Sequence, residues 1–331
     1  MHLIRQYEFG GAQTLRYESG DDLVPAEGQV RIAVAAAGVH LIDTYIRQGE
    51  QMGSYPLPDL PMTPGREVAG TVDAVGPGVS PGWLGAPVVV HLGQAVKPAD
   101  PGGAPAPPSQ RGGGYASQAV ALVESLHRLP SHVAFDQAVA MVGTGRTALG
   151  VLEIAPMGPE DMVLVTSAAG GLGTLLSQAA HNAGASVIAA AGGLHKLDSI
   201  KADVKVDYRS PGWACGLEPT LVLDGVGGSV GREALEALEV GGRFVVFGWS
   251  SGTATEFTSK DVLAKGLSVT ALGPRLIQRP GKLRELADRA LGELAAGRLV
   301  PVVQRFPLAE AARAHEAIET RSTVGKTVLV P

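Results

Sequence analysis

The apolar residues of the first hundred positions fall into short runs that glycine and proline separate. Residues 30–35 and 86–91 form two such runs. Short apolar stretches bounded by turn-forming residues are typical of small antiparallel strands. We therefore predict that the N-terminal part of the chain is rich in β-structure.

From about Asp136 the pattern changes. Apolar strand-like segments at 162–165, 187–191, 221–223 and 244–247 alternate with stretches of helical character. Alternation of strands and helices predicts a parallel sheet covered on both faces. This part of the chain is predicted to be a doubly wound α/β unit.

The remainder of the chain is too short for a third domain. After Leu272 we expect one strongly helical segment, 308–319, and a β-like tail at 327–330, which return to complete the first domain. The predicted domains are therefore 1–125 completed by 273–331, and 126–272. Residues 98–114 contain five prolines and five glycines and predict a long surface loop, either a lid or a spacer.

Charge and composition narrow the class of protein. The chain has 331 residues, of which 45% are hydrophobic and 18% charged, and a formal charge of −5. No long basic run offers a site for nucleic acid or anionic lipid, so neither partner is expected. Residues 1–20 lack a secretory signal, and the uncharged stretch 162–194 is interrupted by glycine and polar residues, unlike a membrane span.

The cysteine content points to a reducing environment. Cys215 is the only cysteine, which excludes an internal disulfide and any multi-cysteine metal cluster. We expect it to be a buried, inert thiol. A cytoplasmic location is the corresponding prediction.

A glycine-rich turn follows the first predicted strand of the α/β unit. Residues 163–173 read as a buried strand, a turn of small residues and the start of a helix with one apolar stripe, for which Gly184 is a plausible stop. The unpaired N–H groups of such a helix, with Gly170 and Gly171 in front of them, allow a pyrophosphate to approach closely. The Ala-x-Gly-x-x-Gly spacing from Ala168 to Gly173 predicts a dinucleotide site.

The second strand indicates which dinucleotide binds. An NAD-preferring site usually has Asp or Glu at the end of this strand to bind the ribose 2′-hydroxyl, and none is present at 189–196. Lys196 instead supplies a cation, which suits the 2′-phosphate of NADPH. Tyr208 and Arg209 can add to the same pocket. The alternative is that Lys196 and Arg209 are ordinary solvated charges on the surface.

Six motifs are spread along nearly the whole chain. They are Ala-Gly-Val-His-Leu-Ile-Asp-Thr-Tyr-Ile-Arg-Gln-Gly at 37–49, Pro-Gly-Arg-Glu-Val-Ala-Gly-Thr-Val-Asp-Ala-Val-Gly at 64–76, the 168–173 turn, Leu-Asp-Gly-Val-Gly-Gly at 223–228, Phe-Gly-Trp-Ser-Ser-Gly at 247–252 and Gly-Lys-Thr-Val-Leu at 325–329. Together these motifs resemble the medium-chain dehydrogenase/reductase superfamily, in its zinc-independent quinone oxidoreductase branch. The resemblance implies a GroES-like, β-rich substrate domain, a Rossmann domain and a homodimer formed by pairing of Rossmann sheets.

The resemblance also implies which residues lie along NADPH. Carried over position by position, these are Thr147, Ala169, Gly170, Gly171, Leu172, Gly192, Lys196, Tyr208, Gly248, Trp249, Ser250 and Lys326, with Asp224 shaping the same wall.

A catalytic metal is not expected. Among the positions at which zinc-dependent relatives carry ligands, His40 remains, but Arg66 stands at the place of a second ligand histidine, which leaves only Glu67 from that motif.

The candidate catalytic residues lie in the first of these motifs. His40 replaces the asparagine that is usual in this branch, and its imidazole can act either as a proton donor or as a plain hydrogen-bond donor. Tyr45 is a candidate donor to substrate, with packing between domains as the alternative. Asp43 and Arg47, four residues apart, are expected to form an ion pair that braces the site.

These features predict an oxidoreductase. The leading hypothesis is hydride transfer from NADPH to a quinone or to the activated C=C bond of an α,β-unsaturated carbonyl compound. An enoyl-thioester or biosynthetic enoyl reductase is a second possibility. A non-catalytic NADPH-binding redox sensor is a third, because a fold alone does not guarantee activity.

Overall fold

The computed structural model describes residues 1–50, 57–92, 112–273 and 279–331. Within them the chain forms two compact units: residues 1–143 with 303–331, and residues 144–302. The boundaries that we expected, 125/126 and 272/273, both lie earlier in the chain. Most of the glycine- and proline-rich segment 98–114 lies outside the described residues.

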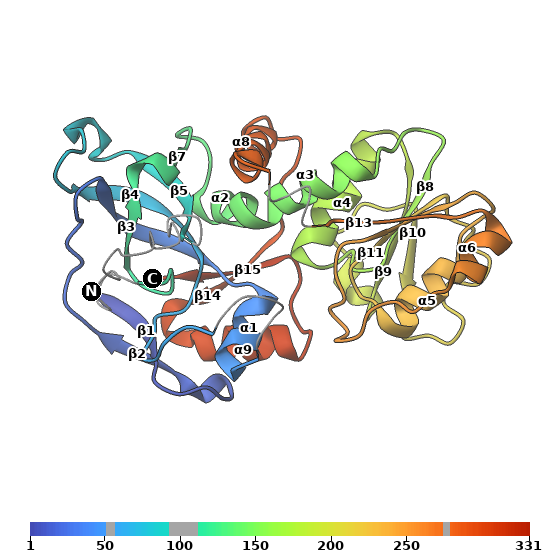
Figure 1. The fold of residues 1–331 in the computed structure, drawn as a ribbon, viewed down its shortest axis with the longest axis horizontal. Coiled ribbons are helices and arrows are strands. Elements are labelled where there is room, and N and C mark those ends of the chain that lie inside the picture. Colours follow the sequence, from blue (N-terminus) through green and yellow to red (C-terminus); the bar gives the residue numbers. More distant parts are fainter. Residues whose placement is uncertain (51–56, 93–111, 274–278) are drawn as a thin grey trace. The chain divides into compact units, whose positions relative to one another are not determined.

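The first unit is built on β-structure and contains both ends of the chain, drawn in blue and red in Figure 1. Its seven-stranded sheet has the order β14-β15-β3-β4-β5-β7, with β6 paired to β3, and β1 and β2 form a separate pair. The strands are β1 (His2–Gln6), β2 (Leu15–Ser19), β3 (Gln29–Gly38), β4 (Glu67–Val75), β5 (Pro87–His91), β6 (Gln118–Leu122), β7 (His127–Arg128), β14 (Val303–Pro307) and β15 (Lys326–Val330). The helices are α1 (Leu41–Gln48), α2 (Phe135–Ala140) and α9 (Ala311–Glu319).

The core of this unit follows from alternation along its longest strands. Val30, Ile32 and Val34 of β3 are buried in one cluster with Val68 and Val72 of β4. Side chains two residues apart on a strand point to the same face, so this spacing places one face of β3 and β4 in the core. The β-rich character predicted for the N-terminal part is confirmed.

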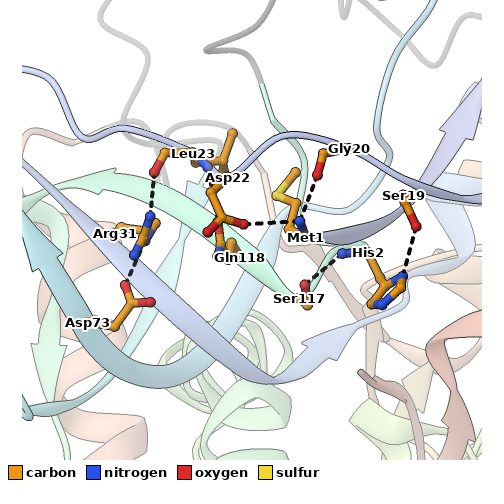
Figure 2. A network of polar contacts seen from close by, with 10 residues as sticks. All are labelled: Met1, His2, Ser19, Gly20, Asp22, Leu23, Arg31, Asp73, Ser117 and Gln118. Atoms are coloured by element: carbon orange, nitrogen blue, oxygen red, sulfur yellow. Dashed lines mark hydrogen bonds and ion pairs between the residues drawn. The ribbon is translucent and has the colours of Figure 1, made fainter.

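Ion pairs and hydrogen bonds hold the loop after β2 against the sheet (Figure 2). The Met1 ammonium lies 3.0 Å from the Asp22 carboxylate. Arg31 of β3 donates to the Leu23 carbonyl at 2.9 Å and pairs with Asp73 of β4 at 2.9 Å. Exposed pairs of this kind contribute little to stability individually.

The second unit is a six-stranded parallel sheet of order β10-β9-β8-β11-β12-β13. Numbered along the chain within the sheet, this order is 3-2-1-4-5-6, the order of a Rossmann fold. Its strands are β8 (Met162–Val165), β9 (Ser186–Ala191), β10 (Val204–Asp207), β11 (Leu221–Asp224), β12 (Arg243–Val246) and β13 (Ser268–Ala271). Its helices are α3 (Arg146–Ile154), α4 (Gly171–Asn182), α5 (Gly228–Ala237), α6 (Ser259–Lys265) and α8 (Lys282–Ala295). The predicted doubly wound α/β fold is confirmed.

The register of the sheet explains its core. Ile188, Leu164, Val222 and Phe244 are neighbours in one row across β9, β8, β11 and β12. All four are buried in the cluster that includes Leu235 of α5. Because both faces of the sheet are covered, its strands read as continuous apolar runs in the sequence.

One helix was missed and one connection is short. α8 is a 14-residue helix, whereas we expected only the segment 308–319 to be strongly helical after Leu272. Its buried residues Leu286, Ala287, Ala290 and Leu294 have helical spacing, a signal present in the sequence. No α-helix connects β10 to β11, and the turns there expose Cys215, so the prediction of a buried thiol is wrong.

Across the described ranges, no helix has the length and apolar character needed to cross a membrane.

Candidate active site

The turn between β8 and α4 has the geometry of an anion-binding loop. α4 begins after Gly170, receives no side-chain cap and has no acidic residue in its first turn. A Cβ atom on Gly170 would meet only the Ser167 carbonyl oxygen, at 3.4 Å, whereas one on Gly173 would lie 1.9 Å from that oxygen. Gly173 therefore allows α4 to pack closely on the turn, while Gly170 leaves the first amides of the helix open to a ligand.

Three further residues predicted to line the cofactor lie in this turn and in the first turn of α4. Ala169 is buried, while Gly171 and Leu172 in the first turn of α4 are half-buried. The helix ends at Asn182 with Ala183 as its C-cap, and Gly184 has a left-handed φ of 83°, which confirms the predicted stop.

The end of β9 carries no acidic side chain. The strand ends at Ala191, followed by Gly192, on which a Cβ atom would lie 3.1 Å from the Tyr208 hydroxyl. Lys196 lies in the short 3₁₀ helix Leu194–Leu197 and is half-buried. The structure thus brings Gly192 and Tyr208 together, and places Lys196 four residues after Gly192.

Arg209 is engaged by a carboxylate that was not among the residues predicted from the sequence. Its Nη2 lies 2.7 Å from Oδ2 of Asp207, the last residue of β10, whose neighbour in the sheet is Ala191. The hydrogen bonds from the Arg209 side chain and from the Gly193 N–H lower the pKa of Asp207 to about 2. Asp207 is therefore ionised and already engaged, and the cation of Arg209 is balanced within its own loop.

Asp224 organises the turn after β11. Its buried carboxylate accepts hydrogen bonds from the hydroxyls of Thr166 and Thr255, at 2.9 and 2.6 Å, and from the N–H groups of Val226 and Gly227, at 3.0 and 3.1 Å. The bond from Thr166 connects the ends of β8 and β11, the two strands at which the sheet order reverses, and the bond from Thr255 adds the segment between β12 and α6. Asp224 has the environment of a structural carboxylate at the edge of the sheet that carries the glycine-rich turn between β8 and α4.

The remaining predicted residues of the second unit lie after β12 and on α3. The Trp249 side chain is 51% exposed, and Ser250 donates its N–H to the Gly225 carbonyl at 3.0 Å. Gly248 precedes them, and a Cβ atom on it would lie 3.6 Å from the Gly225 oxygen, an ordinary contact distance. Thr147 lies in the first turn of α3 and is half-buried.

In the first unit, a buried carboxylate joins two of the predicted site residues. Oε1 of Glu67 lies 2.7 Å from Nε2 of His40 and 2.7 Å from Nζ of Lys326. Burial alone would raise the pKa of Glu67, but the charges of His40 and Lys326 hold it below its usual value. From the sequence, Glu67 was considered only as a possible metal ligand. An acidic residue directly before the apolar run 68–70 of β4 was the signal that could have drawn attention to it.

The expected ion pair between Asp43 and Arg47 is wrong. Asp43 pairs instead with Arg66, whose Nε lies 3.0 Å from Oδ1, and Arg47 is fully buried and pairs with Glu319 of α9. Helical spacing permits the i, i+4 contact, but a buried charge needs a partner whose geometry offsets its desolvation, and the fold supplies Arg66 to Asp43 and Glu319 to Arg47. Arg47 thus ties α1 to α9.

Asp43 belongs to a second buried network. Its Oδ2 accepts from the His40 N–H at 2.9 Å and from the Tyr115 hydroxyl at 3.2 Å, and that hydroxyl lies 3.0 Å from Nε2 of His315. Burial would raise the pKa of Asp43, but the charges of Arg66 and His40 and the hydrogen bond from the His40 N–H together lower this pKa. Burial lowers the pKa of His315 to about 4, so this imidazole is neutral near pH 7.

Of the four candidate catalytic residues, two remain accessible. The His40 side chain is 21% exposed, and Tyr45 is half-buried on α1. Asp43 and Arg47 are buried and engaged with protein groups, which gives them a bracing role. Within the ranges that the structure describes, no three His, Cys, Asp or Glu side chains are grouped in a way that would hold a metal ion.

Comparison with known proteins relates both units to one superfamily. Residues 26–131 match the family described as alcohol dehydrogenase GroES-like domain, and residues 200–329 match the family described as zinc-binding dehydrogenase. The quinone oxidoreductase of Pseudomonas aeruginosa is 31% identical over 338 residues, which cover 98% of this chain and 97% of that protein.

Solved structures agree with this relationship. The Escherichia coli quinone oxidoreductase complexed with NADPH is 29% identical, with a TM-score of 0.79 and coverage of 100% of both chains. An NAD-dependent alcohol dehydrogenase is also 29% identical, with a TM-score of 0.81 and the same coverage. With its GroES-like unit, its Rossmann unit and its full-length similarity to quinone oxidoreductases, this chain belongs to the medium-chain dehydrogenase/reductase superfamily, in the quinone oxidoreductase branch.

Proposed function

We propose that this protein is an NADPH-dependent reductase that transfers a hydride to a quinone or to the activated C=C bond of an α,β-unsaturated carbonyl compound. The observation that carries the proposal is the carboxyl edge of the parallel sheet. There, an uncapped helix begins at the point where the strand order reverses, and the neighbouring strand ends without an acidic residue. Ligands of open α/β sheets bind at such a point.

The residues at this edge fit a phosphorylated dinucleotide. The first amides of α4 suit the pyrophosphate, because unpaired N–H groups and the positive end of the helix dipole favour an anion. Lys196 and Tyr208 are the proposed partners of the 2′-phosphate, and Gly248 to Ser250 line the edge beyond β12. When bound, the dinucleotide supplies a hydride to the acceptor.

Engagement of Asp207 supports the choice of NADPH. Asp207 is the carboxylate nearest in the sheet to the end of β9, but its oxygens are taken by Arg209 and by the Gly193 N–H. A carboxylate occupied in this way is a poor acceptor for the ribose 2′-hydroxyl that NAD presents.

In the first unit, His40 and Tyr45 are the proposed groups that act on the acceptor. Both can donate a hydrogen bond to a carbonyl oxygen on which negative charge develops after hydride transfer. No side-chain nucleophile takes part in this proposal. The protein would bind the acceptor, orient it and exclude water.

Coenzyme titration tests the specificity. We expect NADPH to bind at least about tenfold more tightly than NADH, the equivalent of one charge-assisted bond of about 1.4 kcal/mol. Lys196→Ala should remove most of this preference, whereas Lys205→Ala, at an exposed lysine of β10, should not. Equal affinity of the wild-type protein for the two coenzymes would contradict the proposal.

Stopped-flow oxidation of NADPH tests the reaction. A panel of quinones, enones and enoyl thioesters should show turnover with at least one of the first two classes. Loss of efficiency when the carrier of a thioester is truncated would instead indicate an enoyl-thioester reductase. NADPH binding without turnover of any acceptor would indicate a binding protein rather than an enzyme.

We also propose that the protein forms a homodimer through β13 and acts in the cytoplasm. β13 is an edge strand of the sheet, three of its four residues are exposed, and Leu263 of the adjacent α6 is 83% exposed. An open edge is a template for pairing with a second strand. Light scattering should give a dimer for the wild-type protein, and Thr270→Lys should shift it to monomer, whereas Ser199→Lys at another exposed position should not.

A further inference from the structure

The loop after β10 runs beside the loop after β9, at the carboxyl edge of the parallel sheet. Asp207, the last residue of β10, is the neighbour of Ala191, the last residue of β9, and the Tyr208 N–H donates to the Ala191 carbonyl at 3.1 Å. The Asp207 carboxylate also accepts from the Gly193 N–H. A carboxylate from β10 therefore lies against the turn at which an NAD-specific Rossmann fold carries an acidic residue on its second strand.

The Arg209 side chain covers this carboxylate. Its Nε lies 3.0 Å from Oδ1 of Asp207 and 3.3 Å from Oδ2, and its Nη2 lies 2.7 Å from Oδ2. The Arg209 backbone N–H adds a further bond to Oδ1, at 3.0 Å. Two nitrogens of one guanidinium thus meet both oxygens of one carboxylate, a forked contact that a lysine cannot reproduce. The carboxylate is left with little capacity to accept from the hydroxyl of a ligand.

The same pair is accessible to a ligand. The Arg209 side chain is 62% exposed and the Asp207 side chain is 19% exposed. The contacts of the guanidinium use Nε and Nη2, and within the described residues its Nη1 has no hydrogen-bond partner. Because exposed ion pairs are only weakly stabilising, a bound anion can compete for this guanidinium. Arg209 can therefore hold Asp207 and present a nitrogen to a phosphate group at the same time.

Two glycines keep the space beside this pair open. Gly193 has a φ of 125°, which residues with a side chain rarely adopt, and a Cβ atom on it would lie 3.1 Å from Nη2 of Arg209 and 3.0 Å from Nδ1 of His195. A Cβ atom on Gly192 would lie 3.1 Å from the Tyr208 hydroxyl. Side chains from both loops thus converge on the backbone of this turn. Whether the turn favours a phosphate or a hydroxyl then depends on whether the guanidinium or the carboxylate meets the ligand.

We propose that Arg209 determines coenzyme specificity in two ways: its guanidinium contacts the 2′-phosphate of NADPH, and it covers the Asp207 carboxylate, which in its absence accepts the ribose 2′-hydroxyl of NADH. The proposal rests on the NADPH-dependent function proposed above. With Arg209 in place, the ligand meets a positive charge. Without Arg209, it meets a bare carboxylate, which repels a phosphate and accepts from a hydroxyl.

Calorimetric titration of Arg209→Ala with each coenzyme tests the proposal. We expect the Kd of NADPH to rise at least about tenfold, the loss of one charge-assisted bond, and the Kd of NADH to fall at least about threefold, because Asp207 becomes available. Arg209→Gln, a second uncharged variant, should behave in the same way. Arg298→Ala removes a similarly exposed arginine from another ion pair of this unit and should change neither Kd. An unchanged or weaker affinity for NADH in both uncharged variants would overturn the proposal.

A double-variant cycle tests whether Asp207 is the group that Arg209 covers. Asp207→Asn alone should still prefer NADPH, because the guanidinium remains. Arg209→Ala combined with Asp207→Asn should lose affinity for NADPH without gaining affinity for NADH, since no carboxylate is left to accept from the hydroxyl. If the gain in NADH affinity persisted in the double variant, Asp207 would not be its source and the proposal would be wrong.

Two fragments of the coenzymes locate the effect. Adenosine 2′,5′-bisphosphate and adenosine 5′-monophosphate differ only at the 2′ position, and in Arg209→Ala their affinities should change in the same directions as those of NADPH and NADH. A change confined to the whole coenzymes would place the effect elsewhere and contradict the proposal. If the wild-type protein showed no preference for NADPH, the specificity proposed above would fail. The NADH affinities of the wild type and Arg209→Ala would still decide whether Arg209 covers Asp207.

Discussion

Removal of the Asp224 carboxylate should destabilise the second unit strongly. The side chain is fully buried and accepts four hydrogen bonds, two from hydroxyls and two from backbone N–H groups. In Asp224→Ala the two N–H groups lose their acceptor, at about 1–3 kcal/mol each, while the hydroxyls can rotate toward other acceptors. We expect a loss of about 4 kcal/mol in the free energy of unfolding.

Asp224→Asn separates shape from charge at the same position. Oδ1 accepts three of the four bonds, and the asparagine oxygen can keep all three. The new amide group must donate to Thr255, whose hydroxyl then has to turn away. Since neutral acceptors are about half as strong as ionised ones, we expect a loss of about 1–2 kcal/mol.

Urea denaturation provides the measurement. The fluorescence of Trp213, which packs in the core beside Val222, reports on this unit. Asp198→Asn, at an exposed carboxylate of the same unit, is the control and should have little effect. The reasoning fails if Asp224→Ala costs less than about 1 kcal/mol, or if the alanine and asparagine variants are equally unstable.

Three further predictions concern other buried positions. Gly173→Ala should weaken NADPH binding at least about tenfold in a fluorescence titration and lower the melting temperature, because the new Cβ would stand 1.9 Å from the Ser167 oxygen. Unchanged binding would contradict the close packing of α4 on the turn. The pKa of His315 is about 4 in the folded protein and 6.5 in an unfolded chain, so the unfolded state binds more protons between these two pH values. The free energy of unfolding should therefore fall by about 3 kcal/mol as pH drops from 6.5 to 4. In urea denaturation His315→Asn should lose this pH dependence, and a variant that kept it would show that another group is responsible. Arg47→Met combined with Glu319→Gln should have a higher melting temperature than either single variant. Each single change leaves the other charge without its partner, at about 3–5 kcal/mol. Equal melting temperatures for the single and double variants would argue against the pair.

Local sequence pattern was sufficient to predict the parallel sheet and the glycine-rich turn between β8 and α4. The apolar segments at 162–165 and 221–223 coincide with β8 and with most of β11, because strands buried on both faces leave a continuous apolar record. The turn before α4 could be predicted equally well. Gly170 and Gly173 are needed for contacts within a few residues of their own positions, so their spacing alone carries the information.

The partners of the buried charges were decided by the tertiary structure. Arg47 lies one helical turn from Asp43 but pairs with Glu319, which is 272 positions away in the chain. Glu67 likewise lies between His40 and Lys326, whose strand comes from the far end of the sequence. Periodicity records which face of an element is buried, but not which distant group meets it there. That choice depends on the tertiary structure, which places β15, from the C-terminal end of the chain, beside β3 and so brings Lys326 to Glu67.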